Sequence, residues 1–64
     1  MDEYDFGREY GLQAVADVEF ERVDIDAMAT GSVDIPPGDY QAMRDSGIEQ
    51  PDARQYWRGY NSAM

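Results

Sequence analysis

The 64-residue chain contains no cysteine, no histidine and no lysine. The missing cysteines exclude a disulfide framework, which many small secreted domains use to supplement a thin core. Without cysteine and histidine the chain can build neither a Cys/His zinc site nor thiolate catalysis nor a Ser-His-Asp triad. A domain of this length buries only about 60% of the surface of its unfolded chain. We therefore expect a single small domain over residues 1–64.

Long hydrophobic runs are also missing. No stretch approaches the roughly 18 consecutive apolar residues of a membrane span. The first residues, MDEYDFGREYG, lack the basic and apolar pattern of a signal peptide. We expect a soluble protein in the cytoplasm of a bacterial host.

Negative charge is the outlying property of the composition. Fourteen Asp and Glu residues stand against five Arg, so the net charge is −9. Such a chain is repelled by nucleic acid and by anionic membranes, which predicts a basic protein surface as its partner. Two alternatives stay open, because acidic surfaces also suit a salt-rich cytoplasm and a lysine-free composition also follows from a GC-rich genome.

The first segment, from about Asp2 to Val23, has the spacing of a helix. Its apolar positions fall on one stripe of the helix surface: Leu12, Val15, Ala16, Phe20 and Val23. Asp2, Glu3 and Asp5 suit the positive end of the helix dipole. Gly7 and Gly11 weaken the helix, yet they also create a smooth notch where another helix can approach closely. The notch predicts packing between helices.

The stretch DVEFERVDID, residues 17–26, is less clear because Val18 and Phe20 alternate with acids in one phase and Val23 and Ile25 in the other. This alternation is typical of a strand with a slip at Arg22. A hairpin with a turn at 30–32 is one alternative, and a helix that continues to about Ala29 is the other. We favour helix for 17–23 and leave 24–35 open.

Two further helices are expected in the second half. After Pro36-Pro37-Gly38, Asp39 is placed to cap a short helix that Gly47 ends, with Ile48 folding back on Met43 or Tyr40.

The last helix is expected to start at Pro51. Its stretch YWRGYN is similar to FGREYG in the first helix. The predicted fold class is mainly α, with about three helices around a small aromatic core. The alternative is an α+β domain with a short hairpin within 18–35.

Catalysis and metal binding are both disfavoured. A glycosidase needs a carboxyl group with a raised pKa in an enclosed cleft, which a chain of this size does not easily provide. The stretch DIDAMATGSVDI, residues 24–35, lacks the third acid, the glycine and the final Glu of a calcium-binding EF-hand loop. We expect no enzyme activity, no cofactor and no dedicated metal site.

The aromatic cluster near the C-terminus allows two interpretations. Aromatic and arginine side chains can stack on nucleic-acid bases, but such platforms lie in positively charged grooves. Core packing is therefore the favoured role, with Tyr56 and Tyr60 inside and Trp57 or Arg58 exposed as a contact for a partner.

As a helix, DVEFERVDID has nearly the charge per unit length of a single nucleic-acid strand. As a helix, this stretch carries a net charge of −4 over about 15 Å, or one charge per roughly 3.7 Å. A DNA strand carries one charge per about 3.4 Å of its axis. An extended strand would be roughly 33 Å long and would reduce this charge density by about half.

A small acidic domain with carboxylates along a helix and no catalytic groups resembles the DNA-mimic inhibitors that phages make, and within that group the small anti-CRISPR proteins. The resemblance covers size, charge and general build over the whole chain, and it includes no motif. It implies an inhibitor that binds the basic DNA-binding surface of a CRISPR effector complex, preferably of type I, and blocks target DNA.

The predicted partner contacts are the acids and one aromatic side chain: Asp17, Glu19, Glu21, Asp24, Asp26, Asp34, Asp39 and Trp57. We expect a monomer that binds this basic complex and does not bind nucleic acid directly. The alternative function is a structural or accessory interaction module whose acids keep it soluble. Charge reversal at Asp17 and Glu21 would distinguish the two functions.

Overall fold

The computed structural model describes residues 1–26 and 35–64. They form three helices, α1 (Glu3–Ala16), α2 (Pro37–Asp45) and α3 (Ala53–Asn61), which confirms the mainly α fold class. Within 18–26 no residue is in a strand, and the rest of the hairpin alternative falls on 27–34, outside the described residues. Among the helices of the described part, none is long and apolar enough to cross a membrane.

α1 begins with a reciprocal cap that the acidic start of the sequence supports. The backbone N–H of Asp5 donates to the Asp2 side chain at 3.0 Å, and the N–H of Asp2 donates to the Asp5 side chain at 3.3 Å. Each bond satisfies a backbone donor that the first turn leaves unpaired. The helix therefore starts where the acids predicted.

The end of α1 differs from the prediction of helix over 17–23. The chain leaves the helix at Val18, which has a left-handed backbone with φ of 57°. The N–H groups of Val18 and Glu19 donate to the carbonyls of Val15 and Ala14, which is the Schellman pattern of helix ends. A glycine normally occupies such a position, so the sequence carried no signal for this stop.

α2 ends in the same pattern with the expected residue. Gly47 has φ of +106°, and the N–H groups of Gly47 and Ile48 donate to the carbonyls of Arg44 and Met43. The predicted stop at Gly47 and the return of Ile48 to Met43 are thus confirmed. Asp39, however, lies within the first turn of α2 and does not cap it, because the helix already starts at Pro37.

α3 starts two residues later than predicted. Asp52 is its N-cap and accepts a hydrogen bond from the Arg54 N–H at 2.9 Å, so Pro51 lies before the helix. The backbone N–H of Asp52 also donates to the Glu3 carboxylate at 3.2 Å. This bond holds the first turns of α1 and α3 at the same end of the molecule.

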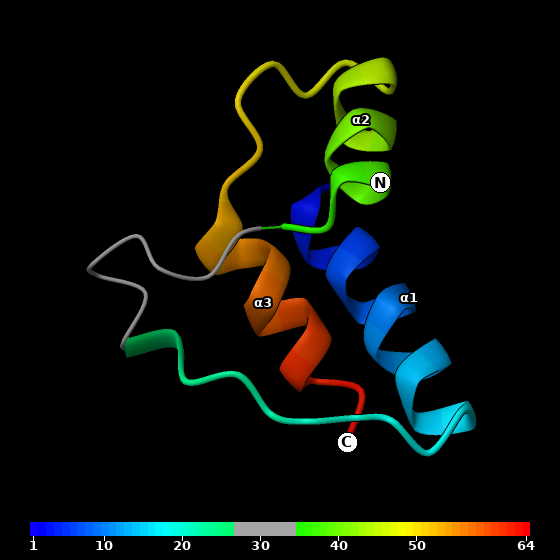
Figure 1. Cartoon of the computed structure of the whole chain (residues 1–64). Coiled ribbons are helices and arrows are strands. Elements are labelled where there is room, and N and C mark those ends of the chain that lie inside the picture. Colours follow the sequence, from blue (N-terminus) through cyan, green and yellow to red (C-terminus); the bar gives the residue numbers. More distant parts are fainter. Residues whose placement is uncertain (27–34) are drawn as a thin grey trace.

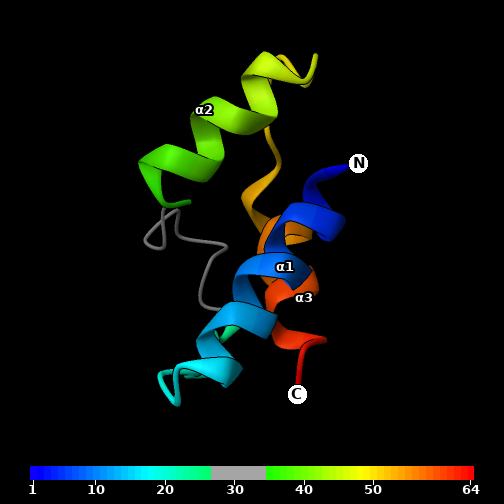
Figure 2. The same ribbon diagram turned by 90° about the vertical axis from the view of Figure 1, so that its right-hand side faces the viewer.

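α1 and α3 pack side by side and run in the same direction (Figure 1). At three glycines an added Cβ atom would overlap a backbone carbonyl of the facing helix: Gly7 at Tyr56, Gly11 at Tyr60 and Gly59 at Tyr4. We call this contact the glycine seam. The notch predicted from Gly7 and Gly11 is therefore confirmed. In Figure 2, α1 lies in front of α3 and crosses it.

The seam also depends on a short pattern that α1 and α3 share, in a register different from that of FGREYG and YWRGYN. Both helices contain Tyr-x-x-Gly, with Tyr4 and Gly7 on α1 and Tyr56 and Gly59 on α3. Gly7 lies against the Tyr56 carbonyl, and Gly59 lies against the Tyr4 carbonyl. The two helices thus use the same four-residue pattern reciprocally.

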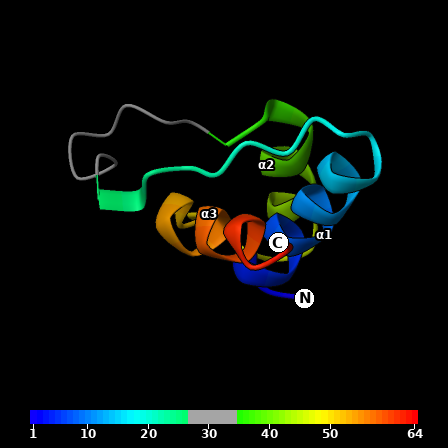
Figure 3. The same ribbon diagram turned by 90° about the horizontal axis from the view of Figure 1, so that it is seen from below.

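The core lies on one side of this helix pair, under α2 and the segment that follows α1 (Figure 3). Three of its five buried hydrophobic side chains come from α3, one from α2 and one from the segment before α2: Tyr56, Trp57 and Tyr60, Met43, and Ile35. The stripe expected on α1 is partly wrong, because Leu12 is 45% exposed and Ala16 is exposed. The residues of α1 that are fully buried are instead Gly7 and Gly11, where the backbone of α1 touches α3.

Candidate functional site

The segment that carries most of the predicted contacts is residues 17–26, which we call the acidic arm. It leaves the end of α1 and crosses the C-terminal end of α3 (Figure 1). Phe20, Val23 and Ile25 are half-buried and pack against the core. The Phe20 ring stacks on the Tyr60 ring, with 4.7 Å between centroids and 13° between planes. These three apolar residues set which side of the arm faces inward.

Two side chains of α3 hold the backbone of the arm. The Glu21 N–H donates to the Tyr60 hydroxyl oxygen at 3.1 Å. The Val23 N–H donates to Asn61 Oδ1 at 2.9 Å, and Asn61 Nδ2 donates to the Val23 carbonyl at 2.8 Å. Asn61 is only 6% exposed. Its amide therefore pairs with Val23 as a neighbouring strand would, and it fixes the course of the arm.

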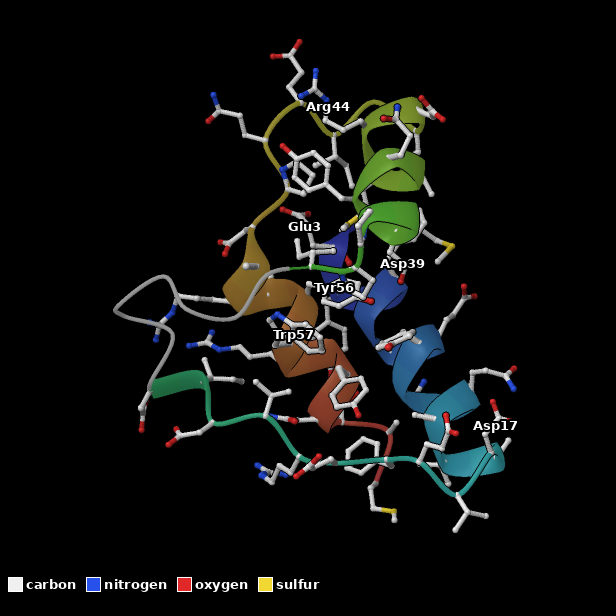
Figure 4. The ribbon with its side chains drawn as sticks, viewed as in Figure 1. Glu3, Asp17, Asp39, Arg44, Tyr56 and Trp57 are labelled. Carbon is white, nitrogen blue, oxygen red and sulfur yellow. The ribbon has the colours of Figure 1, made fainter. Side chains whose placement is uncertain are left out.

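The carboxylates of the arm are not part of these attachments. Each of them is exposed: Asp17, Glu19, Glu21, Asp24 and Asp26. Asp17, at the end of α1, accepts a hydrogen bond from Gln13 Nε2 at 3.1 Å (Figure 4). Asp24 accepts one from the Asp26 N–H at 3.1 Å. The structure thus gathers five predicted contact residues on one segment.

The prediction that these charges are spaced along a helix is wrong. The arm is not helical over 18–24, so Asp17, Glu21 and Asp24 do not share a helix face. An extended backbone advances about 3.3 Å per residue, whereas a helix advances 1.5 Å. The charge per unit length is therefore about half that of the helical form. The match to the charge spacing of a DNA strand does not hold for this conformation.

A hollow of about 350 Å³ lies where the arm meets α3. Its lining combines two acids, one arginine and the amide that holds the arm: Arg22, Val23, Asp24, Ile25, Asp26 and Asn61. Arg22 and Asp24 are exposed, so this hollow is open to solvent along the arm. Within residues 1–26 and 35–64 no group of three potential metal ligands comes together.

Asp39 lies apart from the arm, on α2, and is half-buried. Its Oδ2 accepts a hydrogen bond from the Tyr56 hydroxyl at 2.6 Å, and Figure 4 shows the two side chains pointing toward each other. Burial raises the pKa of the Tyr56 hydroxyl well above its ordinary value, and the hydrogen bond and charge of Asp39 add to this effect. Asp34, the other predicted contact of this region, lies outside the described residues.

Trp57 is 7% exposed, so the expectation of an exposed contact at this side chain is wrong. Its ring packs edge-on against Tyr56 and Tyr60, with centroids 4.9 and 5.2 Å away. Its Nε1 is buried without a hydrogen-bond partner among the described residues. Tyr56 and Tyr60 are buried and Arg58 is exposed, as predicted.

Tyr60 and Asn61 were not identified as site residues from the sequence. Their hydrogen bonds join positions 38 and 39 residues apart in the chain. No local pattern signals such a contact. The one available sign was a polar residue, Asn61, directly after the aromatic Tyr60 near the end of α3.

The exposed carboxylates of this arrangement can bind cations. Exposed carboxylates accept charge-assisted hydrogen bonds from lysine and arginine side chains. General acid catalysis would need a carboxyl group that is shielded from solvent, and Glu3 and Asp39 are the half-buried carboxylates among the described residues.

Comparison of the chain with models of protein families, with characterised proteins and with solved structures finds no match.

Proposed function

We propose that this chain is a non-enzymatic inhibitor whose acidic arm binds the basic, DNA-binding surface of a CRISPR effector complex, preferably of type I. Binding there excludes target DNA, because both ligands need the same lysine and arginine side chains of the complex. The proposal combines the resemblance to small acidic phage inhibitors with the net charge of −9 and the exposed carboxylates of the arm.

One observation carries the proposal. The arm is attached through its backbone, by Tyr60 and Asn61, and through three apolar side chains. Its carboxylates are thus presented, exposed, on a fixed segment, and the side-chain hydrogen bonds of Asp17 and Asp24 are local ones to residues four and two positions away. Fixed charges lose less conformational entropy on binding than charges on a loose tail. Opposite charge on the partner would also accelerate association.

The mimicry supported here is one of charge and not of strand geometry. The extended arm has a lower charge density than a DNA strand, so it would neutralise basic side chains without reproducing the spacing of phosphates. The partner contacts are expected at Asp17, Glu19, Glu21, Asp24 and Asp26.

A second function is favoured by the spread of acids over the rest of the molecule. Glu9 on α1, Asp45 on α2, and Glu49 and Asp52 before α3 are all exposed as well. An interaction module that needs acids only for solubility would have such an even distribution. The experiment must therefore separate position from total charge.

Two variants with equal net charge make this separation. The arm variant carries Glu19→Gln, Glu21→Gln, Asp24→Asn and Asp26→Asn. The control carries Glu9→Gln, Asp45→Asn, Glu49→Gln and Asp52→Asn, where asparagine still caps α3. Each loses four of the net −9 charges and retains −5.

Binding of target duplex DNA by a purified type I effector complex is then measured at low and at high salt. The wild type should inhibit DNA binding at low salt, and the arm variant should be weaker by about tenfold, from four exposed ion pairs of a few tenths of a kcal/mol each. The control should stay within about threefold of the wild type. Equal losses in both variants, or inhibition that salt does not affect, would refute the arm as the binding site.

A further inference from the structure

The surface next to the acidic arm contains an aromatic ring with an unusual setting. Tyr10 is 42% exposed, yet its ring lies against three buried aromatic rings. The centroid distances are 5.5 Å to Tyr60, 6.2 Å to Tyr56 and 6.3 Å to Trp57. The ring of this partly exposed residue is therefore held in a fixed orientation by the core.

Two other tyrosines are exposed to a similar degree, Tyr4 at 38% and Tyr40 at 40%. Among the described residues, neither makes a ring contact with the aromatic cluster. Exposure alone thus does not distinguish Tyr10. Its distinction is that its ring packs against the aromatic cluster while the residue stays 42% exposed.

The ring neighbours of Tyr10 contact two acidic parts of the molecule. Tyr60 accepts the N–H of Glu21 on the acidic arm at 3.1 Å. Tyr56 donates its hydroxyl to Asp39 on α2 at 2.6 Å, which orients this half-buried carboxylate. One aromatic ring, Tyr60, thus connects Tyr10 to the arm, and another, Tyr56, connects it to Asp39.

We infer that Tyr10 and Asp39 form a recognition site for an arginine side chain of the basic partner. The guanidinium stacks on the exposed part of the Tyr10 ring and donates to the Asp39 carboxylate. Arginine fits this site better than lysine, because its planar group both stacks on aromatic rings and makes directed hydrogen bonds to carboxylates. This inference rests on the proposed function in assuming a basic protein partner, and it adds a contact outside the acidic arm.

The test uses the full chain with two probes of equal charge, octa-arginine and octa-lysine peptides, at one fixed salt concentration. The wild type should bind octa-arginine about two- to fivefold more tightly than octa-lysine, the range of a cation–π contact at an exposed site. Tyr10→Leu should remove this preference and leave octa-lysine binding unchanged, whereas Tyr10→Phe should retain it. Asp39→Asn keeps an acceptor for the Tyr56 hydroxyl and should weaken octa-arginine binding by about threefold.

Tyr4→Leu is the matched control, because it removes an equally exposed ring that lies outside the cluster, and it should behave as the wild type. Circular dichroism checks that each variant folds. An independent reading comes from NMR of acetyl-arginine amide, whose side-chain protons should shift upfield with the wild type and not with Tyr10→Leu. The NMR measurement compares only the wild type with Tyr10→Leu, so it remains valid if Asp39→Asn does not fold.

The outcomes separate this inference from the proposed function. Equal affinity of the wild type for both peptides, or equal losses in Tyr4→Leu and Tyr10→Leu, would overturn the arginine site and leave the acidic arm as the contact. An arginine preference that depends on Tyr10 would support the site whether or not the arm variant binds the peptides less tightly. If the arm variant binds both peptides as tightly as the wild type does, that result would count against the arm and not against the arginine site.

Discussion

The glycine seam and the acidic arm are fixed by opposite means. In the seam, the backbones of α1 and α3 touch each other, and Gly7, Gly11 and Gly59 leave no room for a single added carbon atom. In the arm, side chains of α3 reach out to the backbone of another segment through Tyr60 and Asn61. The seam therefore dictates its own residues, whereas the arm leaves most of its side chains unconstrained. The arm can carry many exposed acids because α3 holds it through its backbone and not through its carboxylates.

The largest effect is expected in the seam. Gly7→Ala would place its Cβ inside the backbone of Tyr56, which no change of rotamer can relieve. We expect a loss of about 3 kcal/mol or more, enough to unfold much of a domain of this size. Urea denaturation followed by circular dichroism measures it. Gly38→Ala is the control, since nothing lies within 4 Å of an added Cβ there and the helix should gain up to about 1 kcal/mol. Equal stability of the two variants would contradict the seam.

A smaller effect is expected where the arm is attached. Asn61→Ala removes both hydrogen bonds to Val23 and leaves the backbone N–H and carbonyl of that residue unpaired. The expected cost is about 2 kcal/mol. Amide hydrogen exchange should become faster at Glu21 and Val23 and should change little at Gly11. Uniform acceleration over all of these amides would mean that Asn61 supports the whole fold and not the arm.

Alkaline pH tests the contact between α2 and α3. Tyr56 has a pKa raised above its ordinary value, so the folded state keeps the proton that the unfolded state releases. Stability is therefore intact below about pH 10 and falls as the pH rises above it, by up to about 1.4 kcal/mol per pH unit. Tyr56→Phe should be less stable at neutral pH and should show a shallower alkaline slope. The absence of lysine and cysteine leaves few other groups to titrate there.

The smallest effect compares the two helix ends. Val18 and Gly47 hold the same position in the same hydrogen-bond pattern, with φ of 57° and 106°. A β-branched residue is strained in this region, so Val18→Gly should stabilise the chain by about 0.5–1 kcal/mol. Gly47→Val should destabilise it by more than this gain. Thermal melting checks both, and a loss of stability in Val18→Gly would contradict a left-handed Val18.

The sequence predicted features that local chemistry signals. The acidic start of α1, the close-approach notch at Gly7 and Gly11 and the stop at Gly47 all depend on residues within a few positions of the feature. Each was recognisable because one residue type suits that geometry. The mainly α fold class followed from the same kind of pattern.

The sequence failed where the deciding contact was distant or the usual residue was missing. Val18 stops α1 without a glycine, so the helix was extended seven residues too far, to Val23. Leu12 was placed inside because larger apolar residues usually face the core, but the buried face of α1 is its glycine face. Asp39 was expected to cap α2 and instead accepts the hydroxyl of Tyr56 from another helix.

The parallel course of α1 and α3 has a consequence for how the chain acquires its structure. Antiparallel neighbours joined by a short turn meet early, whereas these two helices connect residues as far apart as Glu3 and Asp52, 49 positions along the chain. Nearly the whole polypeptide must close into a loop before the first contact of the seam forms, and the entropy of that closure is lost before any packing energy is gained. We therefore expect folding slower than that of helical bundles of equal length, whose contacts are mostly local. Neither helix should persist as a stable fragment without the other, because each is too short to be stable alone in water.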